Sequence, residues 1–365
     1  MNRIFNSIEK LPKLYIFSIS IIVTIILGFL DYISGQEFTF YIFYIIPVLF
    51  VVWFAGKKYG LILSFACLLS LYVDNFLGRT IVISVSLIIW NIFIQVSFFV
   101  ILVLLISYLK QILEKEKELE KQKFKRELEI AGEVQRKLFP QTEPEIDGIE
   151  YCGVCIPAEE VGGDYYDYFK IKENEIALVI GDIAGHGLPS ALLMAGLVGF
   201  VRSNAVQYNY DLKVLLEKIN ALMCNSTDGS RFATFFYSTY NSSEKILRFV
   251  NAGHNPPLLY SADTRIFSEL KTNNFIIGAI SSMKYNDSSV KLKSGDLLIY
   301  YTDGITEMFN SKDELFGEER LKEVVEKNSN CSPKEISDKI IWEVKAYAGE
   351  KEQMDDMTLL IIKLK

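Results

Sequence analysis

Four aspartates in the second half of the chain lie where an apolar run meets glycine or turn-forming residues. They occur in the stretches VGGDYYDYF (Asp164), IGDIAGHG (Asp182), YYTDGITE (Asp303) and QMDDMTLL (Asp355, followed by Asp356). A carboxylate at the end of a buried strand is costly to desolvate unless it is paired or binds a cation. One such aspartate is usually a turn former or a cap, but four together predict an oxygen-ligand site for a hard cation such as Mg²⁺ or Mn²⁺.

The residues around these aspartates favour a compact ion site and argue against zinc. Glycine has no Cβ and lets the backbone approach an ion closely, and glycines flank the aspartates at positions 162, 163, 181, 185, 187 and 304. Cys152 and Cys155 form a single CxxC pattern without a second pair or a neighbouring histidine. We therefore expect these cysteines to be packing residues rather than zinc ligands.

Apolar patterns on either side of the aspartates indicate the elements that position them. Alternating or continuous apolar runs predict strands over residues 149–156, 176–180, 232–240, 247–251, 297–301 and 357–364. Helical spacing predicts helices over residues 190–205, 212–223, 319–327 and 333–348. Strands and helices do not alternate one for one, so we expect an α+β domain with a largely antiparallel sheet system rather than a doubly wound sheet.

The composition divides the chain into a membrane part and a globular part. Of its 365 residues 50% are hydrophobic, and the apolar excess lies before about residue 110. We therefore predict a transmembrane region over residues 1–110, a helical linker over 111–140 and a globular domain over 141–365. The net charge of −7 argues against a nucleic-acid partner, and the five scattered cysteines indicate a cytosolic domain without a disulfide framework.

The membrane part contains four apolar runs, at residues 14–30, 38–55, 59–73 and 81–108. The third run is short for a span and is followed by an aspartate, so a buried or re-entrant segment is the alternative there. Lysine and arginine concentrate before the first run, between the second and third, and after the fourth. By the positive-inside rule this distribution predicts four spans with both ends in the cytoplasm, in a multi-pass protein of the inner (cytoplasmic) membrane. The region could be a plain anchor or a sensor.

The linker KQILEKEKELEKQKFKRELEIAGEVQRKLFPQ is rich in Glu and Lys, with opposite charges three residues apart. Apolar residues recur at positions 105, 109, 112 and 119, and then at 124, 128, 131 and 138. The heptad phase therefore slips between Leu119 and Phe124, which indicates a weak, interrupted coiled coil. We interpret this helix as the contact between two subunits of a homodimer, with a solvated single helix as the alternative. Pro140 is expected to end it.

Seven motifs of the globular part occur in an order that resembles a known family. They are AGEVQRKLFP, VGGDYYDYF, IGDIAGHGLPSALLMA, RFATFFYSTYN, NAGHNPPLLY, SGDLLIYYTDGITEMFN and DDMTLLIIK. Over about residues 129–365 they resemble the bacterial branch of the metal-dependent PPM protein phosphatases, of the SpoIIE and RsbU type. The resemblance implies a central β-sandwich flanked by helices, and hydrolysis of phosphoserine or phosphothreonine in proteins at a two-metal centre.

The same resemblance assigns roles to the matched residues. Asp182 would bridge two divalent ions, Mn²⁺ or Mg²⁺, with the Ile183 carbonyl beside it. Asp164 would help to hold one ion, and Asp303 and Asp355 would hold the other. Two such ions activate a shared water for in-line attack on the phosphoryl group. The metals, rather than basic side chains, would then hold the phosphate, and the lack of an arginine directly before GGD implies weak intrinsic binding of substrate.

Two assignments within the matched motifs stay open. Asp356 is the alternative to Asp355, because the DDMT stretch offers two neighbouring carboxylates. His186 could act as a general acid by analogy with a family histidine, although DIAGHG has two more residues than the eukaryotic pattern. We expect structural roles for both histidines, with His254 capping the turn in the NAGH stretch.

The resemblance also implies a partner, a phosphorylated anti-anti-sigma regulator that serves as substrate in the cytoplasm. Two other functions are alternatives. The stretch GGDYYDYF is superficially similar to the GGDEF signature of diguanylate cyclases, but such an enzyme would not use the TDG and DDMT carboxylates. The other alternative is a non-catalytic phosphatase fold that binds a partner, and the presence of all four candidate ligands argues against it.

Overall fold

The computed structural model describes residues 7–34, 41–77, 85–208, 211–227 and 231–365. The chain divides into two compact units, Met1–Lys123 and Phe124–Lys365. Among the described residues, one hydrophobic cluster lies in the first unit and three lie in the second.

The first unit consists of helices that pack around a small apolar core. They are α2 (Lys13–Ser34), the 3₁₀ helix η1 (Tyr41–Tyr44), α3 (Ile45–Phe54), α4 (Lys57–Leu77) and the first part of α5 (Val85–Arg136). The segments Lys13–Ser34 and Ile89–Arg136 are long and apolar enough to cross a membrane. Many large apolar side chains of these helices are exposed, which is unusual for a surface that faces water.

The described parts of the four apolar runs lie in these helices, but the third run lies in a longer helix than the second, contrary to expectation. The third run, expected to be short, lies in the 21-residue helix α4. The second run begins at residues 38–40, outside the described part of the chain, and continues as η1 and the ten-residue helix α3. The fourth run also begins outside the described part and continues in α5. A further segment, Leu188–Gln207, is long and apolar enough to span, but it belongs to the second unit.

The predicted linker is helical as far as Arg136, four residues before Pro140. The last turn then tightens, because Leu138 donates its N–H to a carbonyl three residues back, at 2.9 Å. Of the apolar positions after the phase slip, Phe124 is exposed, but the three that follow it are partly covered. Leu128 and Ala131 are half-buried, and Leu138 packs against a core of the second unit. The slip thus marks where the apolar face of the helix turns toward its own domain.

The second unit is built on two five-stranded sheets in which every strand pair is antiparallel. One sheet has the order β1 (Ile149–Ile156), β10 (Met357–Leu364), β9 (Leu297–Tyr301), β6 (Leu258–Tyr260) and β7 (Phe267–Glu269). The other has the order β2 (Tyr165–Lys172), β3 (Glu175–Ile183), β4 (Ala233–Asn241), β5 (Ile246–Ala252) and β8 (Ser288–Lys291).

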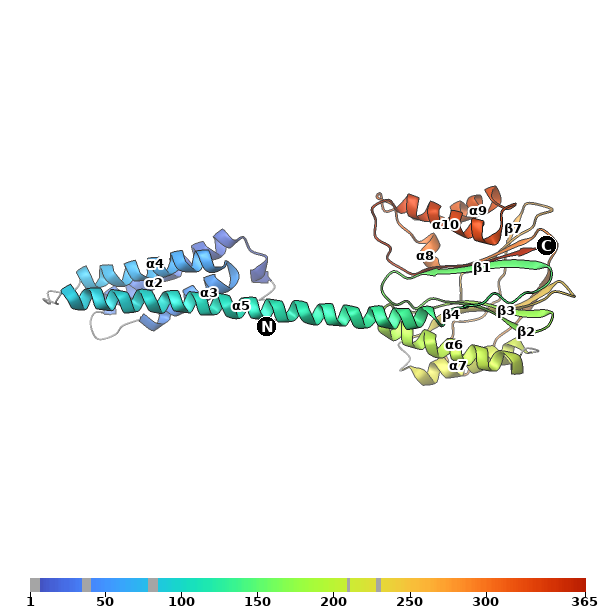
Figure 1. Cartoon of the computed structure of the whole chain (residues 1–365), viewed down its shortest axis with the longest axis horizontal. Coiled ribbons are helices and arrows are strands. Elements are labelled where there is room, and N and C mark those ends of the chain that lie inside the picture. The colour runs from blue at the N-terminus through green and yellow to red at the C-terminus, as the bar shows by residue number, and fades with distance from the viewer. Residues whose placement is uncertain (1–6, 35–40, 78–84, 209–210, 228–230) are drawn as a thin grey trace. The chain divides into compact units, whose positions relative to one another are not determined.

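Helices cover the outer face of each sheet, so the unit has four layers (Figure 1). Helices α6 (Leu188–Tyr208) and α7 (Leu212–Ser226) pack on the β2–β8 sheet, and one core lies between them. A second core lies between the two sheets. Helices α8 (Asp303–Thr306), α9 (Gly317–Lys327) and α10 (Pro333–Ala348) belong to the other side, where the third core lies. The expected sandwich flanked by helices is confirmed.

An ion pair between a half-exposed arginine and a buried aspartate joins α6 to the sheet beneath it. Arg202 of α6 donates from Nε and Nη2 to the two carboxylate oxygens of Asp167, at 2.7 and 3.0 Å. Asp167 is fully buried in β2 and also accepts a hydrogen bond from the Tyr165 hydroxyl. A bidentate arginine is the geometry that best offsets the desolvation of a buried carboxylate. Helix α6 is therefore anchored to the strand that begins directly after Asp164.

Candidate active site

The segments that carry the candidate aspartates meet at one edge of the sandwich. Asp182 lies near the end of β3, and Asp164 directly precedes β2, whose first residue pairs with Gly181. Asp303 follows β9 and begins α8, while Asp355 and Asp356 precede β10. Because Leu359 near the start of β10 pairs with Tyr301 at the end of β9, these segments also share an edge. Each sheet contributes two of the segments.

Asp356 fixes the glycine turn in front of Asp164. Its Oδ2 accepts hydrogen bonds from the N–H groups of Gly163 at 2.8 Å and Asp164 at 3.3 Å, and its Oδ1 accepts from Ala158 at 2.8 Å. A Cβ added to Gly162 would overlap this carboxylate, so the turn requires glycine there. Both oxygens of Asp356 are thus occupied by main-chain donors. The side chain joins the β10 segment of one sheet to the β2 segment of the other.

The Asp164 carboxylate is buried and is oriented by two threonines. Its Oδ2 accepts from Thr302 Oγ1 at 2.7 Å and from Thr358 Oγ1 at 2.5 Å. Burial raises the pKa of Asp164 well above its usual range, and the negative charges of Asp182 and Asp356 raise it further. The threonine hydroxyls act in the opposite direction because they donate to the charged form. The sequence interpretation missed both threonines, although each stands within two residues of a candidate aspartate.

Asp182 lies among carboxylates from the opposite sheet. Burial raises its pKa to about 7, and the nearby negative charges of Asp303, Asp355 and Asp356 contribute to this rise. The pKa of Asp303 is also raised, first by burial and then by the charges of Asp355 and Glu307. Like charges brought together in this way repel one another unless a cation lies between them. Glu307, which lies in the TDGITE stretch but was given no role from the sequence, is thus a further acid near Asp303.

The donor set suits a hard divalent cation, with water completing the coordination. It contains carboxylate and carbonyl oxygens, and the Ile183 carbonyl lies against Gly163, where an added Cβ would be only 2.8 Å from that oxygen. Among the residues that the structure describes, no three His, Cys, Asp or Glu side chains converge closely enough to hold an ion alone. Mg²⁺ usually keeps several waters and takes one or two protein carboxylates, so paired aspartates fit such an ion.

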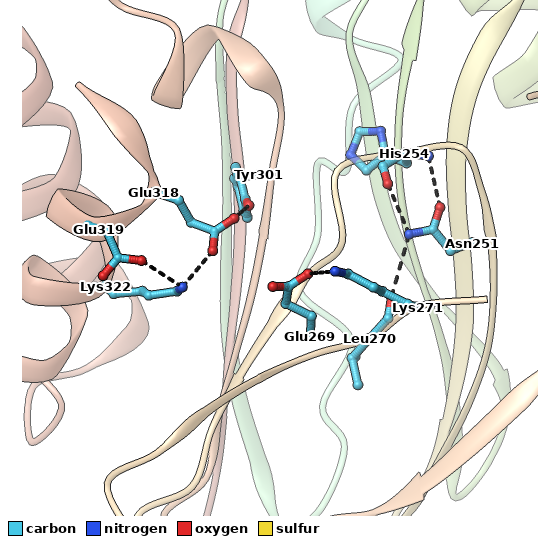
Figure 2. Close-up of polar contacts among 9 residues, drawn as sticks. All are labelled: Asn251, His254, Glu269, Leu270, Lys271, Tyr301, Glu318, Glu319 and Lys322. Carbon is cyan, nitrogen blue, oxygen red and sulfur yellow. Dashed lines mark hydrogen bonds and ion pairs between the residues drawn. The ribbon is translucent and has the colours of Figure 1, made fainter. Parts of the chain in front are cut away.

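The two histidines lie in different environments. The His186 side chain is 88% exposed, with its Nδ1 3.6 Å from Glu159 Oε1, so it is not packed as the expected structural role would require. His254 is buried, its Nδ1 lies 2.8 Å from Thr234 Oγ1, and burial lowers its pKa to about 4. The NAGH turn is closed by Asn251, whose side chain bonds the N–H and carbonyl of His254 (Figure 2). The histidine side chain is therefore not the cap.

Polar contacts also hold the segment that leads to Asp303. The Tyr301 hydroxyl donates to Glu318 Oε2 at 2.8 Å, and Lys322 pairs with both Glu318 and Glu319 (Figure 2). These contacts join the end of β9 to helix α9. They fix the main chain two residues before Asp303.

The cysteine pair in β1 behaves as the sequence predicts. Cys152 and Cys155 are half-buried, and burial raises the pKa of each thiol. Residues three apart in a strand point to opposite faces of the sheet, so these two sulfurs cannot bind one ion together. Both side chains are packing residues.

Comparison with known proteins relates this geometry to one family. A family model described as Stage II sporulation protein E (SpoIIE) matches residues 172–365. Phosphoserine phosphatase RsbU of Bacillus subtilis (strain 168) is 27% identical over 244 residues, which cover 67% of this chain and 72% of that protein. Phosphoserine phosphatase RsbP of the same strain is 29% identical over 185 residues, which cover 50% of this chain and 45% of RsbP. This chain thus spans less than half the length of RsbP.

The fold has a solved counterpart. The SiaA-PP2C domain of Pseudomonas aeruginosa superposes with a TM-score of 0.60 at 22% identity, and the match covers 67% of this chain and 99% of that one. The diguanylate cyclase alternative is therefore wrong, because the matched region has a phosphatase fold and phosphatase relatives. The family model covers more than half of the chain, and the chain accordingly belongs to the SpoIIE family of PP2C-type serine phosphatases.

Proposed function

We propose that this enzyme hydrolyses phosphoserine and phosphothreonine in a regulatory protein by means of two divalent ions, Mn²⁺ or Mg²⁺. The observation that carries the proposal is the position of Asp182 at the edge where the segments of both sheets meet; burial raises its pKa to about 7, and the charges of Asp303, Asp355 and Asp356 add to the rise. Repulsion of this kind makes the empty arrangement unfavourable and favours cation binding. PP2C-type phosphatases use divalent metals, and two relatives bear the name phosphoserine phosphatase.

In this proposal Asp182 would be shared between the two ions, with the Ile183 carbonyl beside it. Asp164 would help to hold one ion, and Asp303 and Asp355 would hold the other. The exposed position of Asp355 supports its selection from the DDMT pair. Both oxygens of Asp356 already accept main-chain hydrogen bonds, so Asp356 has a bracing role.

The side chains of the site would have different roles in the reaction. Divalent ions held by these side chains would supply an activated water for attack on the phosphoryl group and would offset its negative charge. Thr302 and Thr358 donate to Oδ2 of Asp164 and thereby fix the plane of the carboxylate. Asp303 and Asp355 are more exposed than Asp164, so their side is where a phosphorylated segment of another protein can approach.

We further propose that residues 1–110 cross the inner membrane four times and that residues 111–140 link them to a cytoplasmic phosphatase domain at 141–365. The exposed apolar side chains of α2 and α5 support a lipid-facing surface. The apolar positions of the linker before the phase slip, Leu109, Ile112 and Leu119, are exposed as well. They support pairing of two copies through the linker helix. A phosphorylated anti-anti-sigma regulator is the proposed substrate, by resemblance to the RsbU type.

The test uses the full-length chain in detergent micelles with Mn²⁺ and a phosphoserine peptide, and measures released phosphate. We expect hydrolysis that depends on Mn²⁺ and that falls at least a hundredfold in Asp182→Asn and Asp303→Asn. The matched control is Asp263→Asn, because Asp263 is an exposed partner of Lys293 away from the site. Mn²⁺ binding without hydrolysis of any phosphoprotein would instead favour the non-catalytic alternative.

A further inference from the structure

The end of helix α5 contacts the glycine turn that leads to Asp164. Gln135 donates from Nε2 to the Gly162 carbonyl at 2.7 Å and accepts from the Gly162 N–H at 3.1 Å. The Gln135 residue is only 8% exposed. Its carboxamide therefore forms hydrogen bonds with both main-chain groups of Gly162, as the main chain of a neighbouring strand would.

Close packing on two sides holds this turn in place. A Cβ on Gly132 would overlap the carbonyl oxygen of Glu160, and a Cβ on Gly162 would overlap the Asp356 carboxylate. The main chain of residues 160–163 thus lies between the last turns of α5 and the Asp356 side chain. An exposed ion pair of Lys125 with Glu160 lies along the same contact. Because glycine is needed on both sides, the turn cannot shift either way without a clash.

Gln135 also contacts the helix that follows the Asp182 turn. Its Nε2 lies 3.8 Å from the sulfur of Met194 in α6. The turn itself leads directly to Asp164, whose N–H, with that of Gly163, is bonded to Asp356. One buried side chain therefore contacts both the turn that leads to Asp164 and the helix that follows the Asp182 turn.

We propose that Gln135 is a positioning residue for metal binding, which sets the place of the Asp164 carboxylate relative to Asp182. The inference rests on the proposed function, because it takes Asp164 as a ligand. Gln135 touches neither the ligand oxygens nor the substrate; it acts through the main chain of Gly162. Residues that orient metal ligands through hydrogen bonds change metal affinity by tenfold to a hundredfold when they are removed.

The test replaces Gln135 with methionine, which keeps the length of the side chain and removes both hydrogen bonds. The control is Gln141→Met, because Gln141 also donates to main-chain carbonyls, of Arg136 and Phe139, but is exposed and lies outside the turn. Two quantities are measured on the full-length chain in micelles. They are the Mn²⁺ dissociation constant by calorimetry, and hydrogen exchange over residues 158–168 without metal.

We expect the Mn²⁺ dissociation constant of Gln135→Met to rise about tenfold and its metal-free exchange over 158–168 to become faster, with neither change in Gln141→Met. Gln135→Glu keeps an acceptor for the Gly162 N–H and should fall between wild type and Gln135→Met. If circular dichroism shows that Gln135→Met is unfolded, Gln135→Glu takes its place in the test.

Unchanged Mn²⁺ affinity and exchange in the folded Gln135 variant would overturn the proposal. If Asp164→Asn weakens Mn²⁺ binding in the same series, the proposed metal site stands and only the role of Gln135 fails. If Asp164→Asn also binds Mn²⁺ as wild type does, Asp164 is not a ligand and both proposals fail.

Discussion

The ion pair between Asp167 and Arg202 offers a direct test of how the phosphatase unit holds together. Arg202→Met removes two hydrogen bonds, of 2.7 and 3.0 Å, from a carboxylate that has no exposure to solvent. The Tyr165 hydroxyl and the Tyr168 N–H remain as neutral donors to it. We expect this variant to be less stable than wild type, because an unpaired buried carboxylate is left behind.

The size of the effect follows from the surroundings of the pair. Removing one partner of a fully buried pair costs about 3–5 kcal/mol. Here the Arg202 side chain is 39% exposed and two neutral donors remain, so we expect a smaller loss of about 2–3 kcal/mol. For a unit of this size that corresponds to a fall in Tm of roughly 4–12 °C. Asp167→Asn combined with Arg202→Met should recover part of the loss, since an amide carries no charge to bury.

The assay is urea unfolding of residues 124–365, which contain three of the hydrophobic clusters, followed by circular dichroism. The control is Lys293→Met, which breaks an exposed pair with Asp263 and should cost less than about 0.5 kcal/mol. If Arg202→Met is no less stable than this control, the pair does not anchor α6 and the reasoning is wrong.

Four further predictions concern the histidine core, helix α6, the metal and the linker. Burial holds the pKa of His254 at about 4 rather than 6.5, so its contribution to stability is complete above pH 6.5 and is lost as the pH falls toward 4. In urea unfolding, the free energy of unfolding of His254→Gln should therefore fall less over this pH range than that of wild type, by up to about 3 kcal/mol. A Cβ at Gly196 or Gly199 would meet no atom within 4 Å, so replacing both glycines with alanine should raise the free energy of unfolding in urea by about 1–2 kcal/mol. If the Mn²⁺ dependence of activity in this variant is the same as in wild type, helix α6 has no role in regulation. Saturating Mn²⁺ should raise the Tm of wild type in thermal scans but leave that of Asp182→Asn nearly unchanged, and an equal rise in both would contradict the ligand role. Inserting one residue after Lys121 rotates everything downstream by about 100°, so activity in membranes should change strongly and should recover when seven residues are inserted; if every insertion behaves alike, the linker is only a tether.

The fold was predictable where local pattern alone decides structure. The bounds predicted for β1, β9 and β10 agree with those in the structure, because these strands are apolar or alternating runs bounded by turn or polar residues. Strand β2 was missed, because aromatic residues and the buried Asp167 leave it without a clear alternation. The short strands β6, β7 and β8, of three or four residues, exist through pairing with their neighbours, which a local pattern does not contain.

The aspartates of the candidate site were identifiable because each stands beside an apolar run at a glycine or turn residue, and the segments at one edge of the sandwich meet in space. The residues that brace them were not. Thr302 and Thr358 look like ordinary strand formers in sequence, and only the tertiary fold brings their hydroxyls to Asp164. Gln135 bonds a main-chain group 27 residues away, so its own surroundings in sequence carry no sign of the contact.

The place of β10 in its sheet has a consequence for synthesis of the chain. Strand β1 has one neighbour, β10, and Ile156 pairs with Met357, so β1 is made about 200 residues before its partner. While the ribosome is still translating the intervening helices and strands, the first strand of the phosphatase unit remains unpaired and open to wrong partners or to chaperones. The segment with Asp355 and Asp356 arrives just ahead of β10. A nascent chain therefore cannot assemble the full set of candidate carboxylates until almost all of the domain has been translated, so an unfinished phosphatase unit should be inactive.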